Sequence, residues 1–327
     1  MTTMSTRAKL GVVVASAVLL GTVAAGYAAT TAQAPRTPPP VGGGQAVSLA
    51  PGPRLLAITD RHVSTVAATD PAGPRMVGGL ECLRVYAAAG TGVCLRPETA
   101  WSYQVVVLDA ELRQTRAVGV PGLPNRARVS ASGRMVSWTT FVGGDSYTSS
   151  GFSTRTGILD TVTGSTVASL EEFAITKDGG RHRNPDVNYW GVTFTADDNR
   201  FYATMSTGGR RYLVRGDVAA RTVETLKENV ECPSLSPDGT RLAFKEAIDA
   251  DPAKGWRLSV LDLSSMRVTA TAETRSVDDQ AAWLDSGKLA YTLRRDDGQP
   301  DVWSVPADGS GTPVLTILGA ESPSPLT

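Results

Sequence analysis

The sequence predicts an all-β fold, a six-bladed β-propeller of four-stranded antiparallel blades preceded by one hydrophobic N-terminal helix. Two observations carry this prediction. A hairpin pattern recurs along the chain, and after each hairpin come two further short apolar segments. A repeat of roughly 40 residues built from short strands is typical of propeller blades.

The clearest copy of the hairpin is residues 232–246, CPSLSPDGTRLAFKE. Pro237 favours the φ angle that the second position of a turn requires, and Asp238 can accept hydrogen bonds from the nearby backbone. Gly239 supplies a positive φ without steric cost. The segment therefore predicts two strands joined by a tight turn.

Five further segments share this arrangement of strand, polar or glycine-containing turn and strand, namely residues 47–58, 85–95, 129–138, 194–204 and 283–291. A third strand is expected at residues 105–109, 157–160, 212–217, 258–262 and 301–305, and a fourth at residues 116–120, 166–170, 222–226, 267–271 and 312–318. One blade cannot bury both of its apolar faces, so the units are expected to stack in a ring.

The string LSPDGTRLAF at residues 235–244 resembles the Pro-Asp-Gly repeat of TolB-type β-propellers, a WD-like repeat family. The resemblance covers about residues 45–318. Similar repeats occur in periplasmic partner-binding proteins and in the propeller halves of oligopeptidases. The resemblance implies a six-bladed scaffold more strongly than any one activity, because such folds host many functions.

The two ends of the chain differ from the repeats. Residues 1–9 form a short basic N-terminus, and residues 10–29 carry no charge, which is long enough for a helix to cross a bilayer. This segment is either a transmembrane anchor or a signal peptide cleaved near residues 26–28 or 32–34. Both alternatives place the propeller outside the cytoplasm. Residues 30–44 are a Pro/Gly-rich linker, residues 45–318 the propeller, and residues 319–327 an expected disordered tail.

Two of the three cysteines, Cys82 and Cys94, lie twelve residues apart across an expected hairpin. An exported protein could bridge them. The hairpin alignment places Cys94 opposite Val85, which argues against a bridge unless the turn is tighter, so both alternatives stay open. The third, Cys232, is expected to be a buried free thiol.

Composition and motifs exclude several classes of function. The 32 acidic and 32 basic residues balance, which argues against nucleic-acid binding. The sequence lacks a G-x-S-x-G motif, a zinc-type His/Cys spacing and a phosphate-binding loop, so we expect no cofactor and no metal. We expect a monomeric, exported, non-catalytic module, tethered by its helix, that binds a peptide, a protein partner or an envelope glycan. The alternative is a hydrolase or lyase that uses channel acids such as Asp186.

The candidate binding residues are chosen by position. In propellers, the starts of the first strands line the central channel, so polar and aromatic residues there are expected at its mouth. They are Arg126, Asn188, Tyr189, Trp190, Glu231, Asp278 and Asp279. The last three are also the remaining acids for the enzymatic alternative. Residues 177–190, a mixture of charged, amide and aromatic side chains, are expected to form a loop ahead of a first strand.

Overall fold

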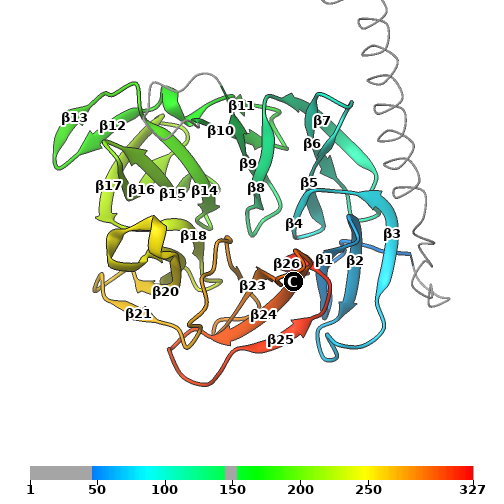
Figure 1. Cartoon of the computed structure of the whole chain (residues 1–327). Helices are drawn as coiled ribbons and strands as arrows, with labels where there is room; N and C mark the ends of the chain where they lie inside the picture. Colours follow the sequence, from blue (N-terminus) through cyan, green and yellow to red (C-terminus); the bar gives the residue numbers. More distant parts are fainter. Residues whose placement is uncertain (1–45, 144–152, 327) are drawn as a thin grey trace, which may run out of the picture. The chain divides into compact units, whose positions relative to one another are not determined.

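The computed structural model describes residues 46–143 and 153–326. The expected basic N-terminus, hydrophobic helix and linker lie outside these residues. Across the described part of the chain, no helix has the length and apolar character that a bilayer crossing requires. Figure 1 shows six sheets arranged around a common centre, which confirms the six-bladed all-β prediction.

Each blade is numbered here from its position along the chain, with its strands given from the centre outwards. Blade 1 contains β26 (Glu321–Pro325), β1 (Arg54–Thr59), β2 (His62–Ala67) and β3 (Met76–Glu81). Blade 2 contains β4 (Arg84–Ala88), β5 (Thr91–Pro97), β6 (Tyr103–Leu108) and β7 (Gln114–Val120). Blade 3 contains β8 (Leu123–Val129), β9 (Met135–Val142), β10 (Ser153–Asp160) and β11 (Thr166–Val167), followed by a short 3-10 helix, η1 (Leu170–Glu172).

The remaining blades follow the same order. Blade 4 contains β14 (Asn188–Phe194), β15 (Arg200–Thr207), β16 (Arg210–Asp217), β17 (Thr222–Glu228), β12 (Ala174–Lys177) and β13 (Gly180–His182). Blade 5 contains β18 (Glu231–Leu235), β19 (Arg241–Ala247), β20 (Trp256–Asp262) and β21 (Val268–Ala270), with η2 (Ile248–Ala250) and η3 (Pro252–Lys254) between β19 and β20. Blade 6 contains β22 (Ala282–Trp283), β23 (Lys288–Arg294), β24 (Pro300–Pro306) and β25 (Val314–Ile317).

The end of the chain corrects the expected disordered tail. Residues 321–325 form β26, which pairs antiparallel with β1 and closes the ring (Figure 1). The innermost strand of blade 1 therefore comes from the C-terminus, and residues 47–53, the expected first strand and turn of that blade, form no strand. Leu326 N–H donates to the Arg54 carbonyl at 3.0 Å, and Gly52 N–H donates to the Leu326 carbonyl at 2.6 Å.

Blade 4 differs from the prediction in two ways. It has six strands instead of four, and residues 177–190, expected as a loop, contain the end of β12, all of β13 and the start of β14. The hairpin β12–β13 adds two strands to its outer side, because β12 pairs in parallel with β17. The rest of that stretch leads into β14.

The core lies between the blades. The buried apolar residues fall into six clusters, one for each pair of neighbouring blades. Strand β19 shows how one strand serves two of them, since Leu242 and Phe244 pack in the cluster with blade 4 while Ala243 packs in the cluster with blade 6. Alternate side chains of a strand point to opposite faces, which explains this division.

The β18–β19 hairpin has the predicted turn. Gly239 adopts φ +71° and its N–H donates to the Ser236 carbonyl at 2.9 Å. Asp238 accepts from Ser236 Oγ at 2.5 Å and from Thr240 N–H at 3.0 Å. The Ser236 hydroxyl, followed by these backbone and hydroxyl donors, lowers the pKa of Asp238 to about 2.

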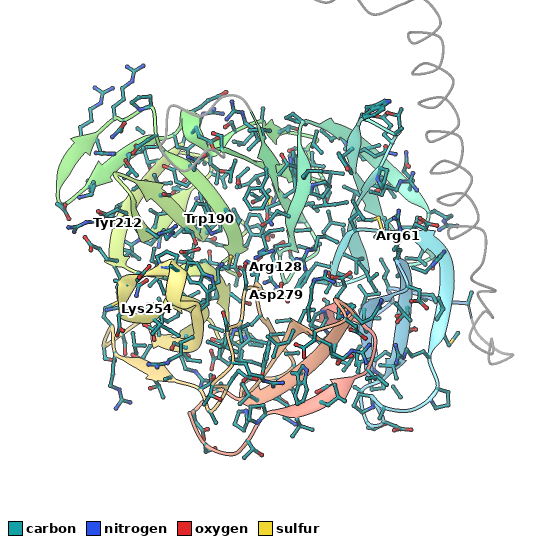
Figure 2. The ribbon with its side chains drawn as sticks, in the orientation of Figure 1. Arg61, Arg128, Trp190, Tyr212, Lys254 and Asp279 are labelled. Atoms are coloured by element: carbon teal, nitrogen blue, oxygen red, sulfur yellow. A yellow bond between two sulfur atoms is a disulfide. The ribbon has the colours of Figure 1, made fainter. Side chains whose placement is uncertain are left out.

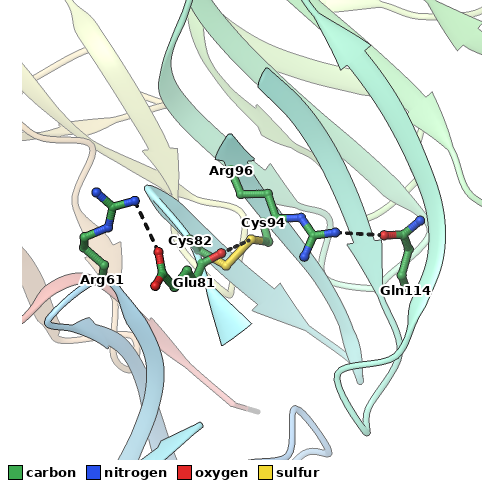
Figure 3. Close-up of a disulfide and its surroundings, with 6 residues drawn as sticks. All are labelled: Arg61, Glu81, Cys82, Cys94, Arg96 and Gln114. Carbon is green, nitrogen blue, oxygen red and sulfur yellow. Dashed lines mark hydrogen bonds and ion pairs between the residues drawn. A yellow bond between two sulfur atoms is a disulfide. The ribbon is translucent and has the colours of Figure 1, made fainter. Parts of the chain in front are cut away.

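Cys82 and Cys94 form a disulfide with Cα atoms 5.5 Å apart (Figure 3). The expected register, with Cys94 opposite Val85, is present as well. The two are compatible because Cys82 precedes β4, and the Leu83 N–H donates to the Leu95 carbonyl at 2.7 Å, which brings the chain back over β5. The inference that this register disfavours a bridge was therefore wrong. Cys232 is free and buried.

Candidate functional site

The centre of the propeller is occupied by residues 278–281, which we call the central plug. They precede β22 of blade 6, and Asp279, Gln280 and Ala281 are buried. Four other blades bind this short segment through side-chain contacts, as described below. Figure 2 shows Asp279 of the plug and Arg128 of blade 3 together at the middle of the ring.

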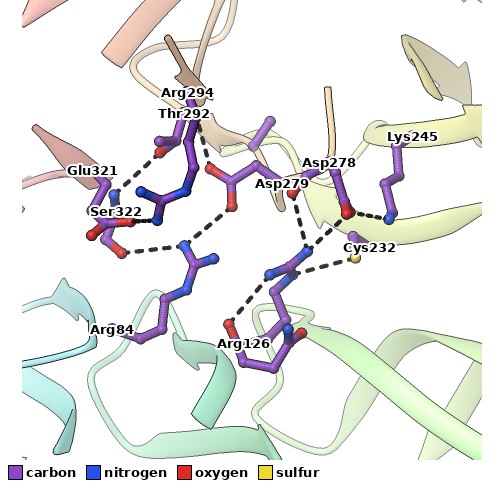
Figure 4. Close-up of polar contacts among 12 residues, drawn as sticks. Arg84, Arg126, Cys232, Lys245, Asp278, Asp279, Thr292, Arg294, Glu321 and Ser322 are labelled. Atoms are coloured by element: carbon purple, nitrogen blue, oxygen red, sulfur yellow. Dashed lines mark hydrogen bonds and ion pairs between the residues drawn. The ribbon is translucent and has the colours of Figure 1, made fainter. Parts of the chain in front are cut away.

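One half of the plug's contacts surrounds Asp279 (Figure 4). Arg84 Nη1, at the start of β4, lies 3.3 Å from Asp279 Oδ1. The Thr292 N–H donates to Asp279 Oδ2 at 3.0 Å. Arg84 also donates to Ser322 Oγ of β26 at 3.4 Å, so the closing strand joins the same group. Burial lowers the pKa of Arg84, while the Asp279 charge acts in the opposite direction.

The other half surrounds Asp278 and Glu231. Arg126 Nη2 lies 3.5 Å from Asp278 Oδ1, and Lys245 Nζ contacts the same carboxylate (Figure 4). Lys245 Nζ is also 3.5 Å from Glu231 Oε2, and Arg211 Nε is 2.8 Å from Glu231 Oε1. Burial raises the pKa of Glu231, and the nearby Lys245 and Arg211 charges oppose that rise.

Hydrogen bonds to backbone carbonyls complete the plug. Gln280 Nε2 donates to the Pro233 carbonyl at 2.8 Å and to the Val192 carbonyl at 3.2 Å, which ties the plug to blades 5 and 4. Arg128 Nη2 of blade 3 donates to the Ala281 carbonyl at 3.1 Å. Arg126 Nε donates to Cys232 Sγ at 3.5 Å.

Little space remains around the plug. The cavity lined by Arg84, Arg126, Arg128, Asp279 and Gln280 holds about 20 Å³. A volume near 10–15 Å³ is roughly what one water molecule needs. At this depth the channel is therefore filled by protein side chains.

The structure brings four of the seven predicted residues together. Arg126, Glu231, Asp278 and Asp279 all belong to the plug network. Only Asp278 has a largely open side chain, with 67% exposed, against 4% for Glu231 and 5% for Asp279.

The other three predicted residues lie on β14 and differ in their surroundings. Asn188 accepts from Thr154 N–H at 2.7 Å and from Ser153 Oγ at 3.0 Å, so it holds blade 3 to blade 4. Tyr189 is fully buried in the cluster between those blades. Trp190 is 8% exposed, and at the next residue Gly191 adopts φ +66°, where β14 passes close to the Cys232 backbone. Asn188 and Tyr189 are thus interface residues, not channel-mouth residues.

Sequence reasoning missed Arg84, Arg128, Lys245 and Gln280. A signal was present for two of them. Arg128 follows Arg126 by two positions in one first strand, and Lys245 interrupts an apolar second strand. A charged residue inside a buried strand is rare unless it is paired, so such positions point to a charged partner nearby.

The comparisons agree with this architecture. TolB from Acinetobacter baumannii superimposes with a TM-score of 0.60 at 14% identity, covering 84% of this chain and 67% of that one. A putative TolB from Agrobacterium tumefaciens gives 0.50 at 11% identity, covering 86% of this chain and 94% of that one. A chain of a nidogen/laminin complex gives 0.55 at 10% identity, covering 84% of this chain and 98% of that one.

At the level of sequence, a TolB homologue from Chlorobium luteolum is 33% identical over 78 residues. This match spans 24% of the chain but only 16% of that relative. No protein-family model matches the chain. The fold and the closed central channel define a six-bladed β-propeller with a plugged centre. The architecture is similar to that of the TolB propellers.

Proposed function

We propose that this chain is an exported, membrane-tethered TolB-like propeller that acts as a non-catalytic binding or scaffold module. The observation that carries the proposal is how the candidate acids are buried and paired. Glu231 and Asp279 are buried and paired with basic side chains, and Asp278 contacts Lys245. General acid–base catalysis needs a carboxyl group within reach of a substrate proton. Glu231 and Asp279 are instead enclosed in the plug, and Asp278, although open to solvent, is paired with Lys245. Asp186 accepts hydrogen bonds from Thr207 Oγ1 and the Gly208 N–H.

Two features support export. The uncharged segment at residues 10–29 suits an anchor or a signal peptide. The Cys82–Cys94 disulfide is the kind of bond that persists in an oxidising compartment and is rare in the cytosol. Both features favour a propeller outside the cytoplasmic membrane.

The partner is expected to bind the face at which the first strands start. We call this the mouth face. Trp101, in the loop between β5 and β6, belongs to it, because β5 runs antiparallel to β4 and ends where β4 begins. Trp101 is 94% exposed, and its loop is held by Thr99 Oγ1 and Ser102 Oγ at 2.8 Å. A rigidly presented tryptophan is a common anchor of protein interfaces.

The test compares Trp101→Ala with Val162→Ala in the full chain. Val162 is 74% exposed and follows β10, so it lies on the opposite face. After cross-linking on intact cells, the wild type and Val162→Ala should capture the same partner from the cell envelope, and Trp101→Ala should capture less. Equal capture by all three, or recovery of the chain from the cytosol, would refute the proposal.

A further inference from the structure

A recess lies between blades 3 and 4. It has a volume of about 840 Å³ and is lined by the start of β10, by residues 171–175 and by residues 181–185 and 187. A volume of 300–1,000 Å³ is roughly the usual range for ligand pockets. Unlike the central channel, this recess has room for a ligand.

One wall of the recess is formed by the extra hairpin β12–β13, and the hairpin is fixed in place. Ile175 of β12 is buried in the cluster between blades 3 and 4. On β13, His182 Nε2 lies 3.1 Å from Thr207 Oγ1 of β15, and Thr207 Oγ1 donates to Asp186 Oδ1 at 2.6 Å. A wall held in this way is preorganised, which lowers the cost of binding.

The charge of the recess favours an anion. Arg181 and Arg183 are exposed, and among the described residues neither forms an ion pair. Of the two acids in the lining, Glu172 is already paired with Arg221 at 2.7 Å. Burial raises the pKa of the other, Glu171, to about 7, so its negative charge is incomplete at neutral pH.

The free edge of the hairpin favours a peptide over other anions. In the sheet order β13 is the last strand, with β12 as its only strand neighbour within the described chain. The edge of β13 that faces away from β12 therefore presents backbone N–H and C=O groups that a further strand could pair with. An acidic glycan carries the charge but lacks the regularly spaced amide groups that such an edge recognises.

We propose that this recess binds an extended acidic segment of a partner protein, which adds to β13 as a strand and pairs its carboxylates with Arg181 and Arg183. Arg181 is on β13 and Arg183 directly follows the strand's last residue, His182, so the two arginines are two positions apart. Alternate residues of the incoming strand lie on one side about 7 Å apart. Acidic residues at alternate positions of the incoming strand match that spacing. The inference rests on the proposed binding function and names the chemistry of its ligand.

The test measures fluorescence anisotropy of blocked, labelled peptides with the purified full chain. The first peptide alternates Thr and Glu, the second replaces Glu with Gln, and the third is the first with alternate backbone nitrogens methylated. The Thr-Glu peptide should bind, and the other two should bind about tenfold more weakly or not at all. R181E/R183E should weaken Thr-Glu binding by about tenfold, and added salt should reduce the difference.

R257E/R267E is the matched control, because it makes the same charge change at two exposed arginines of blade 5. It should bind like the wild type, and all variants should melt alike. Failure of the Thr-Glu peptide to bind, equal binding after R181E/R183E or after methylation, or stronger binding of an oligogalacturonate would each overturn the inference. The proposed function would survive those results if capture still depends on Trp101.

Discussion

Two neighbouring residues, Asp278 and Asp279, have very different environments. The side chain of Asp279 is 5% exposed and faces Arg84, itself 21% exposed, whereas that of Asp278 is 67% exposed. Removing one partner of a buried ion pair leaves the other charge without compensation, which costs far more than loss of an exposed pair. The plug should therefore depend on one acid much more than on the other.

Asp279→Ala should lower the free energy of unfolding by about 2–4 kcal/mol, because Arg84 and the Thr292 N–H both lose their acceptor. Asp278→Ala, the matched control, should cost about 1 kcal/mol or less, because its carboxylate is open to solvent and Lys245 keeps Glu231 as a partner. Urea unfolding of both variants measures the difference. If both variants lost the same free energy of unfolding, the plug would not be held by the buried pair of Asp279 and Arg84.

Glu171 predicts a dependence of stability on pH. Burial raises the pKa of this carboxyl to about 7 from an ordinary value near 4.5. The folded protein therefore binds a proton more tightly than the unfolded chain does. The resulting stabilisation is complete below about pH 4.5 and is lost as the pH rises through about 7. Its size should be roughly 1–3 kcal/mol.

Glu171→Gln should flatten this part of the stability profile, because glutamine keeps the shape of the side chain without the titration. Thermal unfolding of the wild type and the variant between pH 5 and pH 8 measures the effect. Glu172→Gln is the control, since Glu172 is exposed and paired with Arg221. The prediction would be contradicted if, between pH 5 and pH 8, the wild type lost no more stability than Glu171→Gln does.

Among the elements, the sequence best predicts the hairpins, because their turns are specified by residues close together in the chain. The turn at residues 236–239 and the hairpins of blades 2 to 6 follow from Gly, Asp and Pro at fixed positions between alternating apolar residues. Even the register of Cys94 opposite Val85 could be derived in this way. Each of these features depends on residues close together in the chain.

Strand β26 could not be predicted in the same way. Residues 321–325, ESPSP, have the composition of a loop, and their partner β1 lies at the other end of the chain. Proline is tolerated there because an innermost strand has a paired strand on one side only, so it is an edge strand. The hairpin β12–β13 was missed for a related reason, since its pairing with β17 is parallel and non-local.

The candidate site was predictable only in part. Position before a first strand located Arg126, Glu231, Asp278 and Asp279, but it does not say which way a side chain points. Tyr189 consequently enters the core between blades 3 and 4. The plug itself depends on how residues 278–281 cross the centre, which no local pattern specifies.

The disulfide leads to a prediction about one connection between blades. Cys82 lies in the crossover from β3 to β4, and Cys94 lies on β5, so the bond ties the link between blades 1 and 2 to the second strand of blade 2 (Figure 3). C82S/C94S should lower the free energy of unfolding by about 2–4 kcal/mol, the usual effect of closing a loop of this size. Reductant should destabilise the wild type equally and leave the variant unchanged. If reductant leaves the wild type unaffected, the bond does not form in the protein.

At the scale of the propeller, residues 46–143 and 153–326 are stabilised by a closed set of interfaces between blades. Six apolar clusters join each blade to the next, and the cluster between blades 6 and 1 includes Leu55, Ala57 and Val302. Strand β26 completes blade 1 and contacts its neighbours on both sides. Ser324 Oγ donates to the Ala87 carbonyl of blade 2 at 3.0 Å, and Ser322 N–H donates to Thr292 Oγ1 of blade 6 at 3.3 Å. Three blades therefore lose contacts if this strand is removed.

A chain that ends at residue 318 should fail to unfold cooperatively. Without β26, the inner edge of β1 is unpaired, Arg84 loses its Ser322 contact, and the last apolar cluster opens to water at one end. Differential scanning calorimetry should show a broad or absent transition, and a peptide of residues 319–327 added in trans should restore a sharp one. P323A/P325A is the control, because it keeps the backbone that pairs with β1. A truncated chain that melts within a few degrees of the wild type would show that the ring does not need its closing strand.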